Sequence, residues 1–120
     1  MMNIGVVGSR IFNDYLLLAE WLNHFRLSCH VRVDLVTIIS GGAKGADSLA
    51  EDYAENWGMK SLVFKPDWEK YGKSAGFKRN QDIVDNSDMV VAFWDGKSKG
   101  TQDSINKARA AKKPTFIVYF

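Results

Sequence analysis

Five short apolar segments are spread along the chain, and each has the length of one strand. They cover residues 3–7, 35–40, 61–64, 89–93 and 115–120. Several are almost continuous apolar runs, such as "MVVAF" and "FIVYF", without strict alternation of apolar and polar positions. Strands that are buried on both faces of a parallel sheet have this composition. The pattern therefore predicts five strands in a mostly parallel sheet.

Between these segments, hydrophobic residues recur every three or four positions, which is the spacing of an amphipathic helix. Four such stretches cover residues 15–25, 46–57, 77–86 and 101–112. Gly58 supplies a stop for the second stretch. Thr101 is predicted to be the N-cap of the fourth, and Pro114 follows its end.

Strand and helix alternate throughout, and no internal repeat, low-complexity tract or linker divides the chain. A chain of 120 residues can form one hydrophobic core but is too short for two. We therefore predict the α/β class: one domain over residues 1–120, with an open, mostly parallel sheet and helices on both faces.

The composition narrows the classes of function. A formal net charge of +2 argues weakly against a protein built mainly to coat nucleic acid. The single cysteine, Cys29, has no partner for an internal disulfide, and no residue spacing indicates a metal site. No apolar run is long enough to cross a bilayer, and the N-terminus lacks the features of a signal peptide. The sequence thus predicts a cytoplasmic protein with no membrane partner.

Three glycine-containing loops each follow a predicted strand and precede a predicted helix, so they meet at the ligand-binding edge of such a sheet. Their residues are Gly8, Ser9 and Arg10 in "VVGSR", Gly41, Gly42, Ala43, Lys44, Gly45 and Asp47 in "SGGAKGAD", and Gly100 and Thr101 in "WDGKSKGTQD". Helix N-termini expose unpaired amides, and glycine lets a phosphate approach them. Each loop alone is equally consistent with a sharp turn, and none is a Walker A loop or dinucleotide fingerprint. Their convergence favours a nucleotide or a phosphorylated ligand.

Two further features have a structural and a functional interpretation. Asp47 either stabilises the first turn of its helix or accepts hydrogen bonds from a ribose hydroxyl or base amine. The stretch "PDWEKYGKSAGFKRN" interleaves aromatic and basic residues, an arrangement able to stack on a base and neutralise a phosphate. Within it, we expect Trp68 to pack against the domain, and Arg79 and Asn80 to contact a ligand.

Four motifs, taken in order, resemble the YspA-like branch of the SLOG superfamily: "GSR", "SGGAKGAD", "AGFKRN" and "KGT". The resemblance runs almost from end to end, and that superfamily also includes the LOG phosphoribohydrolases and the DNA-processing protein DprA. It implies a Rossmann-like domain that binds nucleotides or nucleotide-derived ligands. It also implies that the loops at residues 8–10, 41–47, 79–80 and 100–101 form the pocket.

LOG enzymes cleave the N-glycosidic bond of nucleoside monophosphates with an arginine and a glutamate. The resemblance places Arg79 at the arginine and Asp103 near the glutamate, and the "PGG" of the enzyme motif reads "WDG" here. Aspartate is one methylene shorter than glutamate, and small displacements of catalytic groups reduce rates strongly. The departure therefore weakens the case for catalysis more than the case for binding.

Three hypotheses follow. The first is a sensor, carrier or sequestering module for a nucleotide-derived small molecule, with no certain cofactor. The second is a nucleoside monophosphate phosphoribohydrolase that uses Arg79 and Asp103. The third is DprA-like binding of single-stranded DNA, which the near-neutral charge disfavours. Relatives of this architecture commonly assemble, so we also expect a homo-oligomer.

Overall fold

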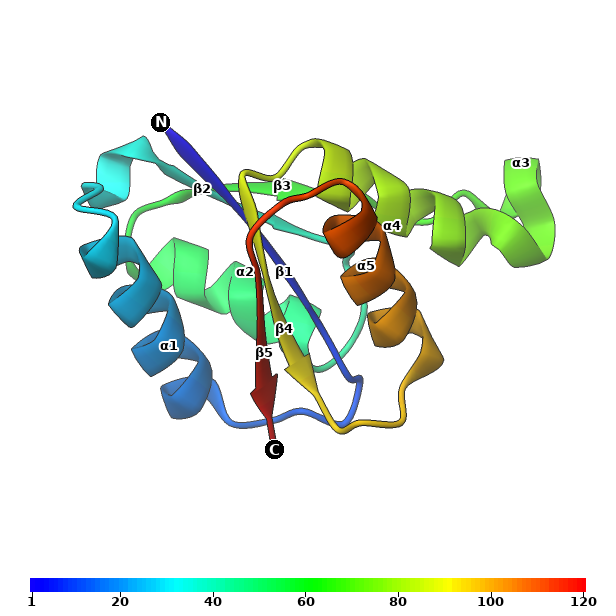
Figure 1. The fold of residues 1–120 in the computed structure, drawn as a ribbon, viewed down its shortest axis with the longest axis horizontal. Helices are drawn as coiled ribbons and strands as arrows, with labels where there is room; N and C mark the ends of the chain where they lie inside the picture. The colour runs from blue at the N-terminus through cyan, green and yellow to red at the C-terminus, as the bar shows by residue number, and fades with distance from the viewer.

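A five-stranded sheet forms the centre of the computed structural model, which describes residues 1–120 (Figure 1). Its strands lie in the order β3-β2-β1-β4-β5, and every neighbouring pair is parallel. The strands are β1 (Met2–Gly8), β2 (Val36–Ser40), β3 (Lys60–Val63), β4 (Met89–Trp94) and β5 (Thr115–Tyr119). The predicted parallel sheet is confirmed, with strand boundaries within one residue of those expected.

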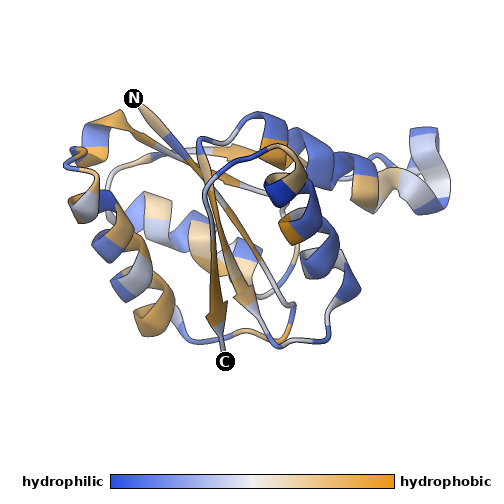
Figure 2. Cartoon of the chain, in the orientation of Figure 1, coloured by the Kyte–Doolittle hydropathy of each residue, from blue (hydrophilic) through white to orange (hydrophobic).

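Helices cover both faces of the sheet. Helices α1 (Tyr15–Ser28) and α2 (Ala46–Asn56) pack on one face, where the larger core of 16 buried residues lies. Helices α4 (Ala75–Asp85) and α5 (Lys99–Ala110) pack on the other face over a core of 8 buried residues. Figure 2 shows the apolar strands of the sheet and the largely hydrophilic surface of α4 and α5, whereas α1 also has exposed apolar residues such as Leu16 and Leu27. The short helix α3 (Trp68–Tyr71) projects beyond the sheet at the start of α4 (Figure 1).

Three local expectations are corrected by the structure. Helix α4 begins at Ala75 rather than Phe77, and α3 is a turn of helix that the hydrophobic pattern did not indicate. Helix α5 begins two residues earlier than expected, so Ser98 is its N-cap and Thr101 is buried in the first turn. The side chain of Ser98 makes no capping hydrogen bond, although serine is among the preferred N-cap residues.

The order of the strands determines where a ligand site can lie. From β1 the chain proceeds to β2 and β3 on one side, and then returns to β4 and β5 on the other. The carboxyl ends of β1 and β4 are therefore followed by loops that lead to opposite faces, which leaves a crevice between them. No helix of the chain is long and apolar enough to span a membrane.

Candidate ligand-binding pocket

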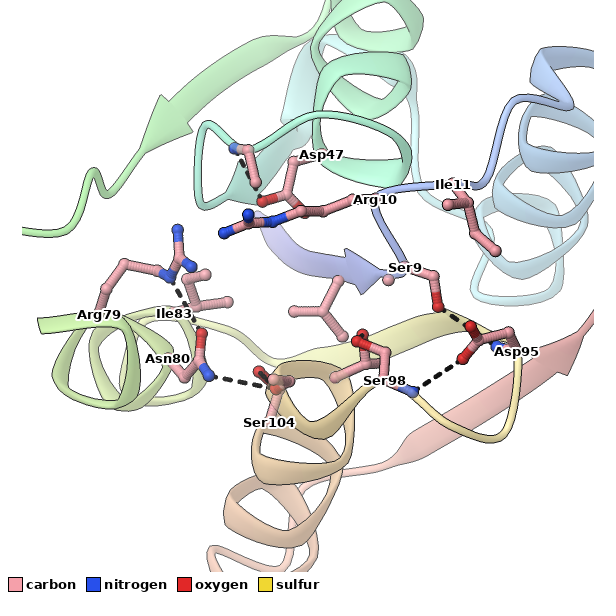
Figure 3. Close-up of a pocket in the computed structure, with 15 residues that line it drawn as sticks. Ser9, Arg10, Ile11, Asp47, Arg79, Asn80, Ile83, Asp95, Ser98 and Ser104 are labelled. Carbon is pink, nitrogen blue, oxygen red and sulfur yellow. Dashed lines mark hydrogen bonds between the residues drawn. The ribbon is translucent and has the colours of Figure 1, made fainter. Parts of the chain in front are cut away.

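A pocket of about 400 Å³ opens at this crevice (Figure 3). Loops after β1, β2 and β4 form its walls together with one side of α4 and the start of α5. Its volume is within the range of small-molecule sites. The residues that line it are Val7, Gly8, Ser9, Arg10, Ile11, Ala43, Asp47, Arg79, Asn80, Ile83, Asp95, Ser98, Gly100, Thr101 and Ser104.

Two glycines bring the first two loops together. A Cβ atom on Gly45 would lie 2.4 Å from the carbonyl oxygen of Ser9, and the φ angle of Gly45 is +76°. A Cβ atom on Gly8 would lie 2.5 Å from the Cβ of Ala46, the first residue of α2. The Ser9 carbonyl also accepts a bond from the amide of Ala46 at 3.4 Å. These glycines are thus required by contacts within the protein, and they set the shape of the pocket wall.

Arg79 reaches the pocket from the second turn of α4. Its Nη1 donates to the carbonyl oxygen of Gly41 at 2.5 Å, and its Nε donates to Oδ1 of Asn80 at 3.0 Å. A Cβ atom on Gly41 would overlap the guanidinium group, so this glycine provides the space that Arg79 occupies. Nδ2 of the buried Asn80 donates to the Gly100 carbonyl and to Asp103, which ties α4 to α5. The guanidinium group is therefore held in one orientation with part of its donors free.

Asp47 is a buried carboxylate in the first turn of α2. Its Oδ2 accepts a hydrogen bond from the amide of Ala43 at 3.2 Å. Burial raises the pKa of Asp47, and the bond from Ala43 and the nearby Arg79 oppose that shift. Asp47 forms no ion pair, because the two ion pairs of the chain join Arg32 to Asp34 and Lys107 to Asp103.

Two guanidinium groups point toward one another across the pocket, those of Arg10 and Arg79 (Figure 3). Neither forms an ion pair. Burial lowers the pKa of Arg79, the Asp47 carboxylate opposes this shift, and the like charge of Arg10 adds to it. Two cations that face the same cavity repel one another unless an anion lies between them. The arrangement therefore favours an anionic ligand at this end of the pocket.

The loop after β4 closes the other end. Oδ1 of Asp95 accepts hydrogen bonds from the backbone amides of Lys97 and Ser98, both at 2.9 Å. These bonds lower the pKa of Asp95. The Asp95 amide in turn donates to Oγ of Ser9, so the first and third loops are joined. The next three amides, at residues 99–101, begin α5 and have no acceptor within the protein. They give this end of the pocket unpaired donors of a kind that suits an anionic group.

Nine of the fourteen residues expected at the site line the pocket: Gly8, Ser9, Arg10, Ala43, Asp47, Arg79, Asn80, Gly100 and Thr101. Gly41 and Gly45 lie directly behind the wall through the contacts described above. Lys44 is exposed and Gly42 packs toward Val63 and Lys65, so neither faces the cavity. Asp103 also lies outside the lining, where Lys107 and Asn80 contact its Oδ2.

Six lining residues were not expected: Val7, Ile11, Ile83, Asp95, Ser98 and Ser104. Asp95 and Ser98 had a detectable signal, since "DGKS" between a strand and a helix is typical of a turn held by an aspartate side chain. Ile83 and Ser104 face the pocket only because α4 and α5 pack side by side. No sequence pattern contains that contact.

The raised pKa of Asp47 leads to a prediction on stability. A carboxyl with a raised folded-state pKa destabilises the fold when ionised, and the penalty disappears as the pH falls through that pKa. Asp47→Asn is therefore expected to be more stable than the wild type at pH 7, and the difference should shrink toward the ordinary pKa of about 3.9. Urea unfolding between pH 3 and pH 8 measures it. Asp52→Asn, at an exposed position of the same helix, is the control, and an equal effect in both variants would contradict the prediction.

The fold and the pocket define the class of the protein: a single Rossmann-like α/β domain with a polar cavity at the carboxyl ends of its central strands. A model of the YspA, cpYpsA-related SLOG family matches residues 2–71. The Gene 61 protein of Mycobacterium phage D29 is 32% identical over 122 residues, which cover 95% of this chain and 94% of that protein. The chain belongs to the YspA, cpYpsA-related SLOG family. The matched region contains the first two loops but ends before Arg79 and the third.

The chain is also similar to a solved structure, that of DNA processing protein A from Helicobacter pylori, described for its mode of binding single-stranded DNA. The two have a TM-score of 0.73 at 19% sequence identity, and the match covers 97% of this chain. It covers only 64% of the other chain, so this protein corresponds to part of its neighbour. The likeness shows a shared fold.

Proposed function

We propose that the pocket binds the phosphate group of a nucleotide or nucleotide-derived small molecule. The observation that carries the proposal is the convergence of the Arg10 and Arg79 guanidinium groups, neither of which has an ion-pair partner. Arginine presents a planar set of donors that matches the oxygens of a phosphate. The free amides at the start of α5 add donors of the same kind.

Asp47 supports the choice of a nucleotide over a simple phosphate. Arg10 and Arg79 are the two cations of the proposed phosphate site. The Asp47 carboxylate is buried beside them and would repel any anionic group beyond the phosphate. The same carboxylate accepts hydrogen bonds from neutral hydroxyl or amine groups. A ligand with a phosphate at one end and a sugar or base nearby satisfies both requirements.

Arg10→Ala is the first test of this function. Arg10 is exposed and makes no ion pair, so its loss should leave the stability unchanged. A hydrogen bond to a charged group contributes about 1.5–3 kcal/mol, so the affinity for nucleoside monophosphates should fall by roughly tenfold or more. Isothermal titration with AMP, GMP, CMP, UMP and inorganic phosphate measures this loss. Arg109→Ala removes the same charge from an exposed position of α5 outside the pocket, and equal affinity of the two variants would contradict the proposal.

The N-glycosidase hypothesis receives less support from the geometry. Its carboxylate, Asp103, lies outside the pocket lining and is paired with Lys107. A group that acts on a glycosidic bond has to reach the reacting atoms. We therefore propose binding rather than cleavage. The expected homo-oligomer stays a prediction.

Single-stranded DNA is a second candidate ligand for the same pocket. The observation in its favour is the shared fold with DNA processing protein A from Helicobacter pylori, a protein described as binding single-stranded DNA. A phosphate of a DNA backbone presents to Arg10 and Arg79 the same oxygens as a nucleotide does.

A further inference from the structure

A small projection next to the pocket exposes three aromatic side chains. We call residues 65–78 the arm; it consists of the loop after β3, helix α3, a 3₁₀ turn (Gly72–Ser74) and the first turn of α4. Figure 1 shows α3 at the far end of α4, well away from the sheet. Trp68 is 55% exposed, Tyr71 38% and Phe77 50%. The sequence predicts that Trp68 packs against the domain, but its side chain is more than half exposed and lies over Gly76, 3.8 Å from where a Cβ atom of that residue would be.

Positive charge surrounds these rings. The Nζ atoms of Lys70 and Lys78 lie 5.1 and 4.8 Å from the centre of the Tyr71 ring, and neither lysine forms an ion pair. The arm contains four cationic side chains, all lysines, and two acidic ones. The arm therefore has a formal net charge of +2, which equals that of the whole chain, so the other residues together are neutral. The positive charge of the protein is thus concentrated on the arm.

We infer that the arm is a binding surface for single-stranded nucleic acid, whose bases stack on Trp68 and Tyr71 and whose phosphates lie near the lysines. Proteins that bind single strands combine exposed aromatic faces with a basic surface, because every base has a face to stack and every linkage has a negative charge. A protein partner would need an acidic surface to match the lysines, whereas a nucleic acid backbone always has one. The near-neutral charge of the whole chain hides this local concentration.

Helix α4 connects the arm to the pocket. Lys78 faces outward on the arm, and the next residue, Arg79, lines the pocket. A single strand with one phosphate between Arg10 and Arg79 therefore continues along α4 toward Tyr71 and Trp68. The inference rests on the proposed function, because the pocket supplies the phosphate site at one end of this path.

Fluorescence anisotropy with labelled dT12 at 50 mM salt tests the inference. The double variant Trp68→Ala/Tyr71→Ala should bind dT12 at least tenfold more weakly than the wild type. Its affinity for nucleoside monophosphates should be unchanged, since neither ring lines the pocket. The control is Trp57→Ala, a 43% exposed tryptophan that follows α2 at the opposite end of the strands. A parallel titration with rU12 compares RNA with DNA, and binding of either single strand supports the inference.

Three outcomes would overturn it. The wild type does not bind dT12 or rU12, the double variant binds as tightly as Trp57→Ala, or a duplex of the same length binds as tightly as the single strand. A duplex hides its base faces, so equal binding would mean that charge alone acts. Sedimentation of wild type and double variant adds a fourth such outcome, because loss of a dimer in the variant would assign the arm to a second copy. Monophosphate binding in the same samples separates failure of the arm from failure of the pocket.

Discussion

Gly45→Ala is expected to lower the free energy of unfolding by about 3 kcal/mol. Two effects add. Gly45 has a φ angle of +76° and a ψ angle of −126°, a conformation that alanine rarely adopts. An added Cβ atom would also lie 2.4 Å from the Ser9 carbonyl oxygen and 2.6 Å from the Arg10 carbonyl carbon. Those neighbours are backbone atoms, so they move only if the first loop moves. Urea denaturation measures the loss.

Gly58→Ala is the matched control for this substitution. Gly58 follows α2 with a φ angle of +68°, but an added Cβ atom there would meet no atom within 4 Å. Alanine should therefore destabilise this position by only about 1 kcal/mol, through backbone conformation alone. The difference between the two variants isolates the close contact of the first two loops. If both variants lost the same stability, the contact at Gly45 would have no energetic weight.

Arg79→Met should reduce nucleoside monophosphate affinity more than any other single change, on the order of a hundredfold or more. It removes one of the two cations that face the pocket and also the bond to the Gly41 carbonyl. Some loss of stability is expected as well, because that carbonyl and the Asn80 side chain lose a donor. Isothermal titration and thermal unfolding of the same sample measure both effects.

Arg79→Lys separates the two roles of Arg79. Lysine keeps the charge but cannot donate in the planar, forked geometry of a guanidinium group. We expect it to recover part of the affinity and little of the bond to Gly41. If Arg79→Lys and Arg79→Met both kept the wild-type affinity, Arg79 would have no role in binding. The proposed phosphate site would then be wrong.

The sequence predicted the sheet well because each strand is an uninterrupted apolar run. In β4, Val90, Val91 and Ala92 follow one another with no polar residue between them, and all three are buried. Such a run is typical of a central strand in a parallel sheet, which is covered on both faces. The three loops were predicted for the same reason, since each joins such a run to an amphipathic helix. The match to the family model then confirmed the resemblance to the SLOG superfamily.

Other features depended on contacts that no local pattern contains. Glycine in "SGGAKGAD" indicates freedom of the backbone, but the sequence does not say that the space beside Gly41 is filled by Arg79, 38 residues later. Asp103 is a second case: the resemblance to the LOG enzymes implied a place in the pocket, but Lys107 and Asn80 hold its carboxylate to one side. The exposure of Trp68 could not be predicted from the sequence, because tryptophan is usually largely buried and it is the projection of α3 from the sheet that exposes this one.

The pocket is assembled from segments that are far apart in the chain: Arg10 follows β1, Asp47 follows β2, and Asp95 follows β4. No fragment with only two of these strands contains a complete site. The unfolded chain therefore has no complete site, so a ligand bound as proposed would shift the folding equilibrium of the whole domain rather than of one loop. In a cell, occupancy of the pocket would set the lifetime of this small domain against proteolysis, because degradation follows the population of the open chain.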